Sequence, residues 1–256
     1  MNKIKILKAP DISKPFAIID KPAGLPSAPL TTEDKDNALY QAMELLPALA
    51  NVCGKKEIEH GLLHRLDTAT SGLLIIASTQ ECYDFLQNEQ KEGKIIKKYK
   101  AVCDIKQTKL TGFPELPQAI QNIIKTDLKK DVCFTVSSYF RPFGPGRKEV
   151  RPVTENDSRA ALEKLGKPVL YTTKIIIVDF IKASNKVVVE CQITNGYRHQ
   201  VRCHLAWCGL PVEGDIIYNG AFKNKSAETM KFCASSLAFE YPRGDLNSYD
   251  RKDTWT

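Results

Sequence analysis

The chain has 256 residues, with 37 Lys and Arg against 30 Asp and Glu, which gives a formal net charge of +7 at pH 7. Its hydrophobic fraction of 43% and charged fraction of 26% are ordinary for a globular protein and exclude a disordered or fibrous chain. No apolar run approaches the roughly 20 residues of a membrane-spanning helix. The N-terminal stretch MNKIKILKAPDISK interrupts its apolar residues with Lys, Asp and Pro, unlike a secretory signal. The composition therefore predicts an intracellular, cytoplasmic protein.

Six short runs are either continuously apolar or alternate between apolar and polar residues, which is the pattern of β-strands. The predicted strands cover residues 16–20, 72–78, 97–104, 173–181, 186–194 and 232–242. The four residues Lys182–Asn185 separate the fourth strand from the fifth and predict a hairpin. In the third strand, alternation places Tyr99, Ala101 and Cys103 on one face.

Three amphipathic stretches between these strands predict helices. The first predicted helix is capped by Asp36 or Asn37 and ends near Leu49. The second begins with the capping box Ser78-x-x-Glu81 and ends near Gly93. The third covers residues 198–208 and is followed by Gly209. Strands outnumber helices and pair through hairpins. The predicted fold class is therefore α+β, with a largely antiparallel mixed sheet flanked by helices and loops.

One domain over residues 1–256 is the expected organisation, since this length supports a single large core. Residues 105–170 match no clear strand or helix pattern and are rich in Pro and Gly. They are predicted to be an excursion from the core.

Eight cysteines show neither a disulfide framework nor a metal-binding pattern, because no two of them are spaced as C-x-x-C. The nearest group is Cys203, His204 and Cys208, on the third predicted helix. A zinc site needs a second ligand pair, so we expect reduced thiols and no metal. His199 and His204 are expected to be structural hydrogen-bonding residues.

Lysine and arginine gather in two segments of the chain. Residues 91–100 hold five lysines and one glutamate. The second cluster consists of Arg141, Arg147, Lys148 and Arg151. On charge alone, a solvated surface and a surface that binds phosphate groups are equally good interpretations.

The segment HRLD (64–67) carries the first candidate for chemistry. Small residues and a predicted buried strand follow it, which places Asp67 at the mouth of a turn that it could merely organise. A protein-kinase catalytic loop, H-R-D, is another interpretation. We reject it, because the chain has no glycine-rich G-x-G-x-x-G loop, no V-A-I-K strand and no downstream D-F-G.

Arg202 is the second candidate, on the third predicted helix. It lies between Val201 and Leu205, on the side expected to face inward. A buried guanidinium needs a carboxylate partner, and Asp67 is a natural candidate. Arg198 lies four residues before Arg202 and is expected on the same helix face.

Four blocks in order resemble the RluA-type pseudouridine synthases, which isomerise uridine to pseudouridine in ribosomal or transfer RNA. The blocks are IIDKPAGLPSAP (18–29), HRLDTATSGLLIIA (64–77), KKYKAV (97–102) and TNGYRHQVRCHLAWCGLPVEGDIIY (194–218). The resemblance implies a pseudouridine-synthase-like catalytic domain in which Asp67 is the nucleophile. Tyr99 is similar to the family's tyrosine that packs on the target base, and Arg202 to the arginine that pairs with the catalytic carboxylate.

The resemblance also implies the partners of the chain. Arg65 is similar to a family residue that engages RNA around the flipped nucleotide, and the residues expected to bind the RNA substrate are Arg65, Lys97, Lys98, Lys100 and Arg198. The family block G-R-T-H-Q reads GYRHQ here (196–200), which leaves the contacts of its early residues open. No cofactor and no metal are needed. The expected partner is rRNA or tRNA, with no membrane, and the expected state is a monomer without a separate N-terminal RNA-binding domain.

Two other functions are alternatives to this one. A catalytically inactive RNA-binding protein on the same fold has no need to keep Asp67, Tyr99 and Arg202 together. A metal-dependent RNA hydrolase needs paired carboxylates or histidine clusters, which the sequence lacks. A carboxylate nucleophile can attach to the uracil ring or to the ribose, and the sequence does not choose between them.

Overall fold

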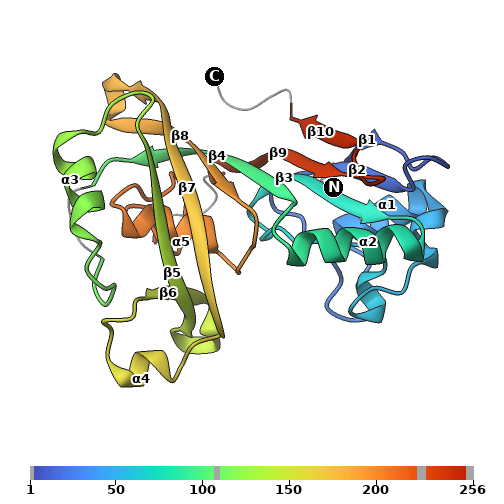
Figure 1. Ribbon diagram of the computed structural model, residues 1–256, viewed down its shortest axis with the longest axis horizontal. Helices are drawn as coiled ribbons and strands as arrows, with labels where there is room; N and C mark the ends of the chain where they lie inside the picture. The colour runs from blue at the N-terminus through green and yellow to red at the C-terminus, as the bar shows by residue number, and fades with distance from the viewer. Residues whose placement is uncertain (1–2, 107–109, 224–228, 252–256) are drawn as a thin grey trace. The chain divides into compact units, whose positions relative to one another are not determined.

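The computed structural model describes residues 3–106, 110–223 and 229–251. Contacts divide the chain into two compact units, the first within residues 1–98 and 233–256 and the second within residues 99–232. Each unit combines strands with helices, so the α+β class is confirmed (Figure 1). One catalytic domain over residues 1–256 stays a prediction. No helix in the described ranges is long and apolar enough to cross a membrane.

The sheet of the first unit mixes antiparallel and parallel pairing. In spatial order its strands are β1 (Lys5–Lys8), β2 (Phe16–Lys21), β3 (Ser71–Ala77), β9 (Phe232–Glu240) and β10 (Leu246–Asp250). Among the described pairings of these five strands with one another, β3–β9 is parallel and the others are antiparallel. There Gly72, with φ of +121°, faces Ala234, and a Cβ at Gly72 would lie 2.2 Å from the Ala234 carbonyl oxygen. The close approach of the two strands therefore requires glycine.

The first unit contains two α-helices, α1 (Ala38–Leu45) and α2 (Gln80–Lys91), and 3₁₀ turns at Pro47–Asn51 and Glu57–Glu59. The side chain of Asn37 caps α1, as the sequence predicts. The helix ends earlier than the predicted Leu49, because Pro47 disfavours helical backbone in the residue before it. Thr79, rather than the predicted Ser78, supplies the side-chain cap of α2.

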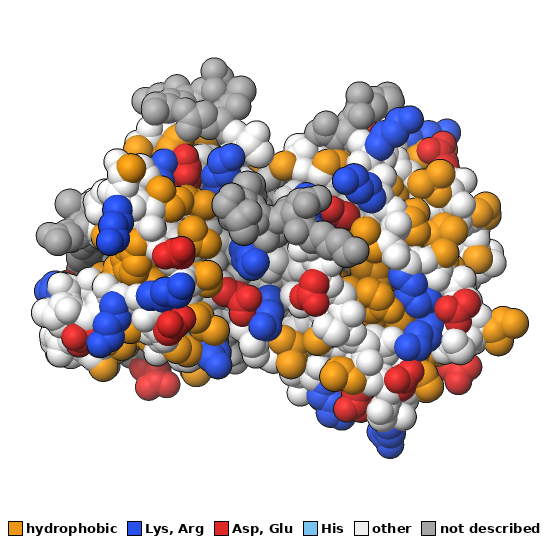
Figure 2. All heavy atoms as spheres, turned by 90° about the horizontal axis from the view of Figure 1, so that it is seen from above, with side chains coloured by type: hydrophobic (Ala, Val, Ile, Leu, Met, Phe, Trp, Pro, Cys, Tyr) orange, Lys and Arg blue, Asp and Glu red, His pale blue; other side chains and the backbone are white. Residues whose placement is uncertain are grey.

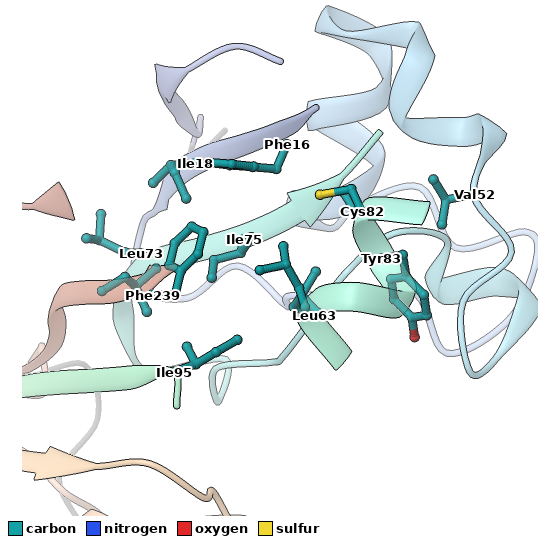
Figure 3. Packing of buried hydrophobic residues seen from close by; sticks show 13 residues of the cluster. Phe16, Ile18, Val52, Leu63, Leu73, Ile75, Cys82, Tyr83, Ile95 and Phe239 are labelled. Atoms are coloured by element: carbon teal, nitrogen blue, oxygen red, sulfur yellow. The ribbon is translucent and has the colours of Figure 1, made fainter. Parts of the chain in front are cut away.

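Side chains from β2, β3, β9 and α2 meet in the hydrophobic core of the first unit (Figure 3). Every residue of β3 is buried, which explains why this strand is continuously apolar in the sequence. Phe16 packs edge-on against Phe239, with ring centroids 5.2 Å apart. This core supports the loop that leads into β3.

The second unit is built on an antiparallel arrangement of long strands (Figure 1). In spatial order the strands are β4 (Ile96–Asp104), β8 (Lys186–Ile193), β7 (Lys167–Ile181), β5 (Cys133–Phe143) and β6 (Glu149–Val153). The helical segments are α3 (Gln118–Thr126), α4 (Arg159–Leu162), α5 (Gln200–Trp207) and the 3₁₀ turns Pro145–Arg147 and Lys182–Ser184. The predicted hairpin β7–β8 is confirmed.

Residues 105–170 are not wholly an excursion from the sheet, because they contain β5, β6 and the start of β7. Residues 107–109 lie outside the described ranges. Strand β5 pairs with both β7 and β6. Its buried positions are Phe134, Val136, Ser138 and Phe140, so burial alternates strictly. The sequence hid this strand because a serine, Ser138, occupies one of the inward positions.

The partner of Ser138 is a buried histidine, His204 of α5. His204 is 0% exposed, its Nε2 lies 3.0 Å from the Ser138 hydroxyl, and its Nδ1 lies 2.8 Å from the Thr173 hydroxyl. Burial lowers the pKa of His204 to about 3, so the imidazole is neutral near pH 7. His204 is therefore a structural hydrogen-bonding residue, as the sequence predicts.

This neutral histidine makes stability depend on pH. Unfolded His204 takes up a proton as the pH falls through its ordinary pKa of 6.5, whereas the folded protein does so only at about 3. The unfolded state thus binds more protons in this window, and the free energy of unfolding should fall on acidification, by at most about 1.4 kcal/mol per pH unit for one group. The free energy of unfolding, measured with urea at several pH values between about 7 and 5.5, should change less steeply with pH for His204→Gln than for the wild type. Equal slopes would contradict this assignment.

Candidate active site

Asp67 lies in the loop that leads into β3, and the turn after β2 holds this loop in place. The Ser27 hydroxyl donates to the Leu66 carbonyl oxygen at 2.8 Å and lies 2.9 Å from the Leu66 N–H, which donates to it. The Gly24 N–H donates to the Thr68 carbonyl oxygen at 2.8 Å. These bonds flank Asp67 on both sides, so the backbone that carries its half-buried side chain is fixed.

Lys21, the last residue of β2, is fully buried beside the same loop. Its Nζ donates to the carbonyl oxygens of Leu25 at 2.6 Å and Thr68 at 3.3 Å. Burial lowers the pKa of Lys21 to about 8, although the charges of Asp67 and Asp20 favour the ammonium form. Lys21 is not among the predicted site residues. The sequence signal that could have found Lys21 is its place at the end of an apolar strand, where a lysine is unusual.

A second cation, Arg251, reaches the base of this loop. Its Nε lies 2.9 Å from Asp20 Oδ2, and its Nη1 donates to the Ser71 hydroxyl at 3.0 Å. Between Asp67 and Ser71, Thr70 is buried, and its hydroxyl has no hydrogen-bond partner among the described residues.

The HRLD segment contains two basic residues of different character. Arg65 is exposed, with its Nη1 3.3 Å from Glu59 Oε1. His64 is a candidate that the sequence did not single out. Burial, and then the charge of Lys97, lowers the pKa of His64 well below its ordinary value, so it is neutral. The exposure of Arg65 is compatible with RNA binding, and that role stays a prediction.

Lys97 is buried rather than part of a solvated face, so its side chain is not placed for the expected contact with RNA phosphates. It is 4% exposed, and its Nζ lies 2.7 Å from Gln90 Oε1. Burial lowers the pKa of Lys97 to about 8. The period of two in β4 explains this position, because it places Lys97 on the same buried face as Tyr99, while Lys98 and Lys100 are half-buried.

Tyr99 is a largely buried residue of β4 in the second unit. Its ring stacks on that of Phe232, with centroids 5.3 Å apart and planes 9° apart. Stacking of this kind fixes the plane of the ring. Tyr99 therefore has the rigidity expected of an aromatic wall, although its role toward a base stays a prediction.

Arg202 is held by a buried carboxylate that the sequence did not single out, Asp215. The Arg202 Nε and Nη2 lie 2.7 and 2.8 Å from the two Asp215 oxygens, and the side chains are 4% and 0% exposed. Asp215 Oδ1 also accepts from the N–H groups of Ile217 and Tyr218. Burial raises the pKa of Asp215, but the bonds and charge of Arg202 outweigh it, and the net pKa is below its ordinary value.

The expectation of a carboxylate partner for Arg202 is thus confirmed, with Asp215 as a partner. Pairing between Arg202 and Asp67 joins residues of different units and stays a prediction. The missed signal was Asp215, the second acidic residue of VEGDIIY (212–218), in the same sequence block as Arg202.

Arg198 does not share a helix face with Arg202, because α5 begins only at Gln200. His199, with φ of +58°, stands at the helix N-cap, and Arg198 precedes it. The exposed Arg198 side chain donates through Nη2 to the carbonyl oxygens of Arg147 and Glu149. Among the described residues, no three His, Cys, Asp or Glu side chains form a group that could hold a metal ion.

The buried ion pair gives a prediction about stability. Arg202→Ala leaves the Asp215 carboxylate buried without its cation and should lower the free energy of unfolding by about 3–5 kcal/mol. The control is Arg159→Ala, which removes an exposed pair with Glu163 and should cost about 1 kcal/mol or less. Urea unfolding of both variants measures the difference. Equal costs would show that the Arg202–Asp215 pair is not sheltered.

Comparison with known proteins agrees with these motifs. The profile described as RNA pseudouridylate synthase matches residues 15–207. The tRNA pseudouridine(31) synthase of Saccharomyces cerevisiae is 27% identical over 237 residues, which cover 92% of this chain and 51% of that protein. The mitochondrial pseudouridylate synthase RPUSD4 of Xenopus tropicalis is 30% identical over 209 residues, which cover 80% of this chain and 57% of that protein.

A solved structure with a similar fold carries a related name. The solved structure of human RNA pseudouridylate synthase domain containing 1 matches with a TM-score of 0.61 at 16% identity, over 98% of this chain and 84% of that chain. The chain spans 51% to 62% of the length of three curated relatives. Because the family profile matches residues 15–207, well over half of its length, the chain belongs to the RNA pseudouridylate synthase family.

Proposed function

We propose that this protein is an RNA pseudouridine synthase that isomerises specific uridines to pseudouridine in rRNA or tRNA. The observation that carries the proposal is the Asp67 loop, because Ser27 and Gly24 fix the backbone on both sides of a half-buried carboxylate. Matched relatives include proteins named for tRNA and for the large ribosomal subunit. Action as a monomer in the cytoplasm is part of the same prediction.

The chemistry requires a nucleophile that attaches and later leaves. In the isomerisation the bond between uracil N1 and ribose C1′ breaks, and a bond between C5 and C1′ forms. The proton on C5 is lost, and N1 gains a proton, so the product is an isomer of the substrate. An ionised Asp67 carboxylate can attach to the ring or to the ribose and be released at the end. The Lys21 ammonium beside the loop supplies positive charge near this carboxylate.

The target uridine has to leave the RNA stack before it can react. This costs a few kcal/mol in a duplex and least in a loop. We propose that Tyr99, with its plane fixed by Phe232, packs on the detached uracil and that its hydroxyl takes part in proton transfer. Asp215 holds the guanidinium of Arg202, which we propose acts on the catalytic carboxylate.

The nucleophile is tested by Asp67→Asn, which keeps the size of the side chain and removes its charge. This variant should make no pseudouridine, while its melting temperature and RNA affinity stay close to wild type. The control is Asp84→Asn on the exposed side of α2, which should keep full activity. The assay is release of tritium from RNA labelled at uracil C5. Turnover by Asp67→Asn close to wild type would contradict the proposal.

Two substitutions of Tyr99 separate stacking from proton transfer. Tyr99→Phe keeps the ring, so it should bind RNA normally and turn over slowly. Tyr99→Leu removes the ring and should also bind the target RNA more weakly. Affinity and single-turnover rates of the two variants decide the matter, and a fully active Tyr99→Phe would leave the hydroxyl without a chemical role.

A further inference from the structure

The net charge of +7 is not visible as one basic field on the face that Figure 2 shows, where Lys and Arg are interspersed with Asp and Glu. A basic surface has to be located from the contacts of individual residues. Residues 91–100 fit poorly, because Lys97 is buried and Lys94 pairs with Glu89 and Glu92.

The hairpin β5–β6, together with Arg198, whose side chain contacts its tip, carries cations that are not neutralised in this way. Arg141, Arg147, Lys148 and Arg198 make no ion pair with any carboxylate in the described part of the chain. The one acidic residue of the hairpin, Glu149, pairs with Arg151 at 3.4 Å. We call Arg141, Phe143, Arg147, Lys148, Arg151 and Arg198 the hairpin surface.

An aromatic ring lies at the centre of the hairpin surface. Arg141 and Arg151 are cross-strand partners, and their guanidinium carbons lie 5.0 and 3.3 Å from the ring centroid of Phe143. Cation–π contact holds both guanidinium groups against the ring. Arg151 is mostly covered, with its side chain 17% exposed, whereas Arg147 and Lys148 are exposed. Half-buried Arg141 and Phe143 thus present a flat group beside exposed cations.

The tip of the hairpin is fixed in an uncommon conformation. Arg147 has φ of +53°, a left-handed backbone conformation that residues other than glycine rarely adopt. Arg198 holds it there through bonds to the carbonyl oxygens of Arg147 and Glu149. A tip held in this way needs little ordering when it binds a ligand.

Flat groups flanked by unneutralised cations match the chemistry of an unpaired nucleic acid strand. Bases that are not stacked in a duplex stack on aromatic rings and guanidinium planes, and phosphates pair with the cations. We infer that the hairpin surface binds an unpaired stretch of the RNA substrate outside the target uridine, with one base stacked on the Arg141–Phe143 pair. This inference deepens the proposed function and rests on it for the identity of the ligand.

The experiment separates charge from stacking. All variants are made in the full chain carrying Asp67→Asn, and their affinity for RNA is measured at several salt concentrations. Two RNAs are compared, a short unstructured RNA and a duplex that contains the same sequence. Arg141→Gln with Lys148→Gln should flatten the salt dependence by about 0.7 in log–log slope per lost contact. Phe143→Leu should weaken binding of the unstructured RNA by about tenfold at an unchanged slope, with little effect on the duplex.

Two controls keep this test decisive. Lys129→Gln with Lys130→Gln removes two exposed charges at the opposite end of β5 and should leave slope and affinity unchanged. Phe143→Tyr keeps a ring and should restore binding, which separates stacking from misfolding. Any of three results would overturn the inference. Phe143→Leu could bind unstructured RNA as tightly as the parent chain, or lose as much affinity for the duplex as for unstructured RNA. The third is a salt dependence of the Arg141→Gln, Lys148→Gln variant that equals that of the parent chain. If the variants bind RNA as expected but the wild-type protein makes no pseudouridine, the proposed function alone would be overturned.

Discussion

The carbonyl oxygen of Thr68 is the point on which the candidate site depends. It accepts hydrogen bonds from the Gly24 N–H and from Lys21 Nζ, so the turn after β2 and the loop before β3 form one structure. Ser27 closes the same contact on the other side of Asp67. Because β2 and β3 are paired along their whole length, the core beneath them keeps this contact in register. Two sequence blocks that are far apart in the chain thereby position one carboxylate.

Both units bury charged residues, and some of these are candidate site residues or lie beside one within the same unit. Lys21 and Lys97 have their pKa lowered to about 8 by burial, and Arg202 with Asp215 forms a sheltered pair. A buried ion pair is often no more stabilising than well-packed apolar residues. We therefore propose that these buried charges serve the electrostatics of the reaction rather than stability. The hairpin surface differs, because Arg147, Lys148 and Arg198 are exposed and thus available to a polyanion.

The sequence predicted most completely what is decided locally. Continuous apolar runs marked β2 and β3, and Asn37 marked the start of α1. What it missed is decided by tertiary partners. Ser138 hid β5 because its partner, His204, is distant in the chain, and Asp215 was overlooked because Asp67 already offered a carboxylate for Arg202. Lys97 was mistaken for a surface residue through its charge, although the alternation that placed Tyr99 also buries Lys97.

We propose that Asp67, held between two fixed loop segments, carries out pseudouridine formation in RNA. Pseudouridine mapping of total RNA tests this claim most directly, because it detects the activity and identifies the target together. Cells are compared that contain the wild-type protein, Asp67→Asn or no copy of the protein. At least one position in rRNA or tRNA should be modified only in the cells that contain the wild-type protein. Identical maps in the three cells, or the same modification with Asp67→Asn, would contradict this proposal.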